Sequence, residues 1–118
     1  MTQEDKELLL KDLCARLPYG VKIQVPYEDG SGYFDETVWE VNNEGPFHVN
    51  GWGIEYEYVK PYLFPLSSIT KKTLEELSAY IDIKNAYVAV EFFNSHHMDY
   101  RGLIEKGLAV DATGLNIY

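Results

Sequence analysis

The chain has 118 residues, of which 46% are hydrophobic and 25% are charged, and its formal net charge is −9. This length and apolar content predict one globular domain, residues 1–118, with a hydrophobic core of its own. The negative charge argues against direct binding to nucleic acid and against binding to anionic membranes, because phosphate groups repel it.

Cysteine content and the first residues restrict the class of protein further. Cys14 is the only cysteine, so the chain can form neither an intramolecular disulfide nor a zinc site built from thiolates. We interpret Cys14 as a small buried hydrophobic residue. The polar start MTQEDKELLLKDL does not resemble a secretory signal, and no apolar run is long enough to span a membrane. We therefore expect a cytoplasmic protein.

The first expected element is an amphipathic helix over about residues 3–16. Thr2 and Asp5 have the spacing of a capping box, and Leu9, Leu13 and Leu17 recur at every fourth position. Charged residues are expected mostly on the other side of the helix: Lys6, Glu7, Lys11, Asp12 and Arg16.

Four strands are expected next. Apolar and polar residues alternate over 21–25, and the turn DGSG leads into a second strand over 33–41. Residues 47–50 favour a short third strand, and 54–58 show the clearest alternation in the chain. These strands predict an antiparallel meander, which could curl towards a small barrel covered by the first helix.

The second half of the chain is expected to be mainly helical, so the fold class is α+β. The two prolines of KPYLFP, residues 60–65, indicate an extended crossover. A helix capped by Ser67, Ser68 or Thr70 should follow and continue to about Tyr80. Residues 86–97 have strand propensity and helical spacing at once. Residues 103–107 indicate a short helix that ends at Gly107, with an extended piece after it.

An acidic and aromatic stretch offers the first candidate binding surface. No Lys or Arg occurs between Ile23 and Val59, a stretch rich in Asp, Glu, Tyr and Trp. Trp52, Tyr56 and Tyr58 are the candidate contact residues, because exposed aromatic side chains beside carboxylates can dock a protein partner. The alternative is a meander with its aromatic residues inside and its acids outside. Glu55 and Glu57 lie on one strand face but form no specific catalytic pair.

The second candidate surface is the run from His96 to Arg101. Imidazole and carboxylate groups suit zinc or iron, but adjacent histidines point in different directions, so His96 and His97 are poorly placed to share an ion with Asp99. Asp99 is better interpreted as the cap of the following turn. Tyr100 and Arg101 could lock that turn, with Arg101 paired to a carboxylate. We predict no catalytic residue, metal or cofactor from these patterns.

Three blocks carry a resemblance to known sequences: LCARLPYGV at 13–21, VKPYLFPLSSIT at 59–70 and NSHHMDYRGLIEKGLA at 94–109. Together they resemble a family of small uncharacterised proteins from gut-bacterial genomes and their phage-like or mobile regions. The resemblance implies no activity and no catalytic residue. Relatives carry a more helical sequence before the last block, which favours a helix over 86–97.

These observations lead to one functional hypothesis and two alternatives. The leading hypothesis is a non-enzymatic accessory or protein-interaction module of a phage or mobile element. Its partner would be a protein that binds the acidic aromatic sheet or the groove around His96 to Arg101. The first alternative is a small metal-dependent or hydrolytic enzyme that uses the His96, His97 and Asp99 region. The second is an acidic DNA mimic that inhibits a basic enzyme.

Overall fold

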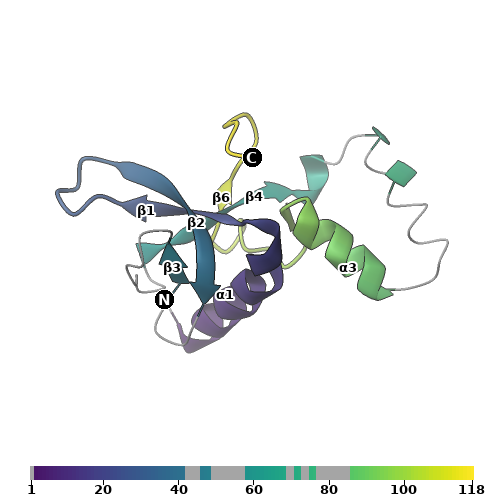
Figure 1. Ribbon diagram of the computed structural model, residues 1–118, viewed down its shortest axis with the longest axis horizontal. Helices are drawn as coiled ribbons and strands as arrows, with labels where there is room; N and C mark the ends of the chain where they lie inside the picture. Colours follow the sequence, from purple (N-terminus) through teal and green to yellow (C-terminus); the bar gives the residue numbers. More distant parts are fainter. Residues whose placement is uncertain (1, 42–45, 49–57, 69–70, 73–74, 77–85) are drawn as a thin grey trace.

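The computed structural model describes residues 2–41, 46–48, 58–68, 71–72, 75–76 and 86–118. Within these ranges the fold is α+β, as the sequence predicted, with helices packed against a mixed sheet (Figure 1). The helices are α1 (Gln3–Arg16) and α3 (Ala86–Ser95). The strands are β1 (Lys22–Pro26), β2 (Tyr33–Val41), β3 (Pro46–His48), β4 (Lys60–Pro65), β5 (Met98–Asp99) and β6 (Val110–Asp111). No helix in this part of the chain is long and apolar enough to cross a membrane.

Helix α1 begins at the predicted capping box. The Asp5 amide donates to Thr2 Oγ1 at 3.1 Å, and the Thr2 amide donates to Asp5 Oδ2 at 3.4 Å. These two bonds satisfy amides that have no partner inside the helix. A 3-10 turn, Leu17–Tyr19, follows α1, and Gly20 ends it with a φ of 69°, which a glycine adopts without strain.

The first three strands form the predicted antiparallel meander. β1 pairs with β2 from Lys22↔Thr37 to Pro26↔Tyr33, and β2 continues into pairing with β3. Burial alternates along β1, with Ile23 and Val25 buried. The turn of the β1–β2 hairpin extends away from both helices (Figure 1).

Residues 60–65 are extended, as predicted, but they form strand β4 of the sheet rather than a crossover. β4 lies next to β1, with Gln24↔Lys60 and Ile23↔Pro61 opposite each other. Pro61, which has no N–H, is tolerated here because of the direction of the opposite backbone. The Val21 carbonyl accepts from the Val38 amide of β2, and every second residue of a strand directs its backbone N–H and C=O groups to the same side, so Ile23 also faces β2. The residue opposite Ile23 therefore needs no N–H.

β4 also makes the sheet a mixed one. It pairs in parallel with β6 at Tyr62↔Val110 and with β5 at Phe64↔Met98. The order of the described strands is β3-β2-β1-β4-β5, with β6 beside β4, and they do not close into a barrel.

Other predictions had mixed outcomes. Residues 86–95 are helical, as the resemblance favoured. Of the helix expected to continue to about Tyr80, residues 71–72 and 75–76 are described and helical, and residues 69–70, 73–74 and 77–80 lie outside the described residues. The possible cap residues Ser67 and Ser68 belong to a 3-10 turn, Leu66–Ser68. The strand expected over 54–58 also lies outside them, apart from Tyr58. Residues 103–107 form consecutive turns rather than a helix.

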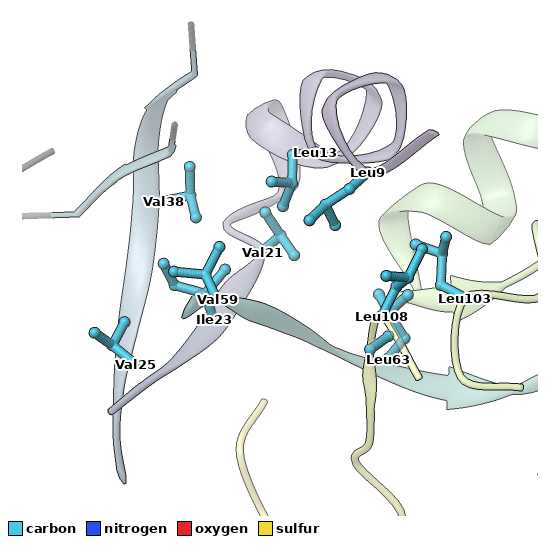
Figure 2. Close-up of a cluster of buried hydrophobic side chains, with 11 residues drawn as sticks. Leu9, Leu13, Val21, Ile23, Val25, Val38, Val59, Leu63, Leu103 and Leu108 are labelled. Atoms are coloured by element: carbon cyan, nitrogen blue, oxygen red, sulfur yellow. The ribbon is translucent and has the colours of Figure 1, made fainter. Parts of the chain in front are cut away.

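The core lies between α1 and the sheet. Leu9 and Leu13 are fully buried and point towards Val21 and the sheet, and Leu63, Leu103 and Leu108 pack beside them (Figure 2). A side chain of this kind contributes about 1.5–3 kcal/mol when it is fully buried.

The inner face of α1 differs from the predicted one. Cys14 is exposed rather than buried, whereas Asp12 and Arg16 are fully buried rather than on the outer side. Positions 9, 12, 13 and 16 follow the i, i+3, i+4, i+7 spacing of one helix face, so the two charged residues share the face of the leucines.

Adjacent positions of α1 provide a test of this orientation. Leu13→Ala should lower the free energy of unfolding by about 2–5 kcal/mol, because it leaves a cavity in the core. Cys14→Ser should change it by less than about 0.5 kcal/mol, because the thiol is exposed. Urea unfolding measures both, and the reverse ranking would mean that α1 presents its other face.

Candidate functional site

A buried ion pair on α1 forms the centre of the candidate site. Arg16 Nε donates to Asp12 Oδ2 at 2.8 Å, and both side chains have no exposed surface. The residues are four positions apart, so the helix itself brings them together. Removing two charges from water is costly unless each is paired and hydrogen-bonded, so the other contacts of this pair decide whether it is tolerated.

The rest of the Arg16 guanidinium binds the chain reversal after α3. Nη1 donates to the Phe93 carbonyl at 3.4 Å, and Nη2 donates to the Met98 carbonyl. One side chain of α1 thus holds the end of α3 and the start of β5. The Phe93 carbonyl lies in the last turn of α3, where carbonyls lack a partner within the helix, and the Met98 carbonyl also accepts from the Tyr100 amide at 3.1 Å.

Arg101 completes the cluster from the other side. Its Nε donates to Asp12 Oδ1 at 3.2 Å, and its Nη2 donates to the Tyr100 hydroxyl at 2.7 Å. The Tyr100 ring lies 4.7 Å from the Arg101 guanidinium and 5.4 Å from that of Arg16, so its π face contacts two cations. One carboxylate and one aromatic ring therefore serve both arginines. The pairing of Arg101 with a carboxylate agrees with the sequence prediction.

Asp99 caps the next turn, as predicted. Its Oδ1 accepts from the Leu103 amide and its Oδ2 from the Ile104 amide, each at 2.9 Å. The turn ends where Leu108 N donates to Leu103 O and Gly107 N to Ile104 O, with Gly107 at a φ of 74°. This is a Schellman motif. The Asp99 cap and the stop at Gly107 enclose a single turn, so the helix expected over 103–107 does not form.

His97 is buried in an unusual backbone conformation. Its φ is 56°, a left-handed value that is uncommon outside glycine, and its carbonyl accepts from the Phe64 amide at 2.8 Å. The imidazole stacks on the Tyr118 ring, with centroids 3.6 Å apart and planes 9° apart. Its Nδ1 has no hydrogen-bond partner among the described residues. Burial, together with the nearby Arg16 and His96, lowers the pKa of His97 to about 4.

The predicted metal-binding set does not come together. His96 is exposed and lies against Phe92, with ring centroids 4.3 Å apart, whereas His97 is buried against Tyr118. Both oxygens of Asp99 already accept backbone amides. In the ranges that the structure describes, no three His, Cys, Asp or Glu side chains form a possible metal site.

The remaining candidates fall in two groups. Trp52 and Tyr56, with the Glu55 and Glu57 pair, lie outside the described residues. Tyr58 is described, and 57% of its surface is exposed.

The sequence interpretation missed three residues of this cluster: Asp12, Arg16 and Tyr118. The sequence contained a signal for the first two. Asp12 and Arg16 are four positions apart and lie on the same helix face as Leu9 and Leu13, which indicates an ion pair beside the core. The role of Tyr118 depends on residues far away in sequence, so no local pattern indicates it.

Comparisons of the chain with protein-family models, with curated proteins and with solved structures find no match. The site must therefore be interpreted from its own geometry.

The buried ion pair yields a stability prediction. Asp12→Ala should destabilise the protein by about 3–5 kcal/mol, because it leaves the Arg16 guanidinium buried without a carboxylate. The neighbouring Lys11 is exposed, so Lys11→Ala should change the free energy of unfolding by less than about 0.5 kcal/mol. Denaturant unfolding compares the two, and similar small effects would show that Arg16 does not depend on Asp12.

His97 yields a pH prediction. Its pKa is about 4 in the folded protein and about 6.5 when unfolded, so the unfolded chain binds the proton more readily between these values. Stability should be lost as pH falls from about 6.5 to 4, by about 3 kcal/mol in total.

The control for this prediction is His97→Gln, which cannot titrate. The difference in unfolding free energy between wild type and His97→Gln should be constant above about pH 6.5 and change steadily below it. Parallel curves for the two proteins down to pH 4 would contradict the low pKa of His97.

Proposed function

We propose that this chain is a non-enzymatic protein-interaction module, and that residues 24–37, the β1–β2 arm, form its binding surface. The sequence suggested two surfaces, the acidic aromatic sheet and the groove around His96 to Arg101. The second is largely engaged inside the fold: Asp99 caps a turn, Arg101 binds Asp12 and His97 is buried. The described geometry therefore favours the first surface, and we propose that its anchors lie on the arm rather than at Trp52, Tyr56 and Tyr58.

Two exposed tyrosines on the arm carry the proposal. Tyr33 is 63% exposed and Tyr27 is 49% exposed, on a hairpin that extends away from the helices (Figure 1). Tyr27 packs against Phe34 with ring centroids 5.1 Å apart. Tyr33 precedes Phe34 in the strand and so lies on the opposite face of the hairpin. Tyrosines with this exposure are typical anchors of protein interfaces, because they offer a large rigid surface with a polar end.

The charge of the arm indicates a basic partner. Residues 24–37 contain four carboxylates, on Glu28, Asp29, Asp35 and Glu36, and no Lys or Arg. Hydrogen bonds from Ser31 lower the pKa of Asp29, which keeps this carboxylate ionised in the turn. An acidic surface with exposed tyrosines suits Arg and Lys side chains, which can pair with the carboxylates and lie over the rings.

The biological setting belongs to the same proposal. The resemblance of blocks 13–21, 59–70 and 94–109 supports an accessory protein of a phage or mobile element. A DNA mimic would also bind a basic partner, but it would recognise a nucleic-acid-binding surface of that partner.

The test is affinity purification of a partner from native host lysate with three forms of the tagged protein. Tyr33→Ser should reduce capture by about tenfold or more if Tyr33 is an anchor. Tyr58→Ser is the matched control, since Tyr58 is 57% exposed but lies outside the arm, and it should capture the partner as well as wild type. Capture should also weaken as salt is raised, because the attraction is partly ionic.

Three outcomes would contradict the proposal. A partner lost in Tyr58→Ser but kept in Tyr33→Ser would place the surface elsewhere. No specific partner for the wild type, with folding intact by circular dichroism, would remove the interaction function. A captured nucleic-acid enzyme that double-stranded DNA displaces would support the DNA mimic instead.

A further inference from the structure

The Tyr118 hydroxyl occupies a position where two strands would otherwise pair directly. The register Gln24↔Lys60 and Ile23↔Pro61 places Lys22 opposite Tyr62, yet the pairing of the two strands stops at Ile23. The Tyr118 hydroxyl instead accepts from the Lys22 amide at 2.8 Å and donates to the Tyr62 carbonyl at 2.8 Å. It thus satisfies one backbone donor and one backbone acceptor on neighbouring strands.

Aromatic side chains form the walls around the same ring. The His97 imidazole is stacked on it at 3.6 Å, and the Phe64 ring lies 6.1 Å away at an angle of 53°. We call the set of Lys22 N–H, Tyr62 C=O, His97 and Phe64 the phenol slot. It combines a flat surface for a ring with a donor and an acceptor for one hydroxyl, so a phenylalanine would leave two polar groups unpaired.

The segment that supplies Tyr118 is partly exposed. Leu115 is 49% exposed and Tyr118 as a whole is 42% exposed, although its hydroxyl is bonded on both sides. Lys22 Nζ holds the Ile117 carbonyl at 2.8 Å. Desolvation of the hydroxyl raises the pKa of Tyr118 to about 12, so the phenol stays neutral and can both donate and accept. Exposed segments with few buried contacts open at low cost in free energy.

We propose that the phenol slot is a recognition site for a tyrosine side chain, which Tyr118 occupies within its own chain and which a tyrosine of another polypeptide binds when residues 113–118 detach. The slot recognises a flat ring that bears a para hydroxyl, whatever the sequence around that tyrosine. This site is separate from the β1–β2 arm and does not depend on the function proposed for it.

The experiment uses the full chain with Tyr118→Ala, which empties the slot, and N-acetyl-tyrosinamide as the probe. Nuclear magnetic resonance titration should show saturable binding with a shift of the Lys22 amide. N-acetyl-phenylalaninamide, the matched control ligand, should bind at least tenfold more weakly, because it lacks the hydroxyl. Wild type should bind the probe at least tenfold more weakly than the variant, because Tyr118 already fills the slot.

Either of two results would overturn the proposal: no binding of N-acetyl-tyrosinamide to the folded variant, or equal binding of the phenylalanine analogue. If Tyr118→Ala does not fold alone, the tyrosine probe should restore folding and the phenylalanine analogue should not. Tyr118→Phe gives an independent measurement, since it keeps the ring and removes the hydroxyl. Hydrogen exchange at the Lys22 amide should then be at least tenfold faster than in wild type, and an unchanged rate would also refute the slot.

Discussion

The carboxylate of Asp12 is the constraint on which the described structure depends most. It has no exposed surface and binds two guanidinium groups, from Arg16 at 2.8 Å and from Arg101 at 3.2 Å. Arg16 extends the same network to the carbonyls of Phe93 and Met98. A buried network of this kind must be complete, because any unpaired member costs the full desolvation of a charge. The end of α3, β5 and the turn after it are therefore held in one position relative to α1.

The local pattern of the sequence was sufficient for the first half of the described fold. The boundaries of α1, the alternation in β1 and the extent of β2 follow from capping residues, spacing and turn chemistry within a few positions. The cap role of Asp99 is local in the same way, since its amide partners lie four and five positions ahead.

Long-range contacts explain where the sequence misled. Arg16 binds carbonyls 77 and 82 positions away, so its burial follows from tertiary structure and not from helix periodicity alone. The prolines of β4 argue against a strand as long as the pairing is unknown, because proline cannot donate to a neighbouring strand. The pairing removes this objection, since Pro61 stands opposite Ile23, where no N–H is required. Tyr118 has no local signal at all, since its hydroxyl bonds lie 96 and 56 positions away.

The same long-range contacts divide the molecule into regions with different roles. Most of the run from His97 to Arg101 is committed to packing, and among the described residues the β1–β2 arm and the phenol slot are the two places that we propose for binding. Strand β1 joins the two: the Lys22 amide belongs to the slot, and Tyr27 follows Pro26 at the other end. An extended strand spans about 3.3 Å per residue, so these positions are separated by only about 17 Å. Strand β1, which pairs with both β2 and β4 near its start, thus connects the β1–β2 arm to the Lys22 amide that binds Tyr118.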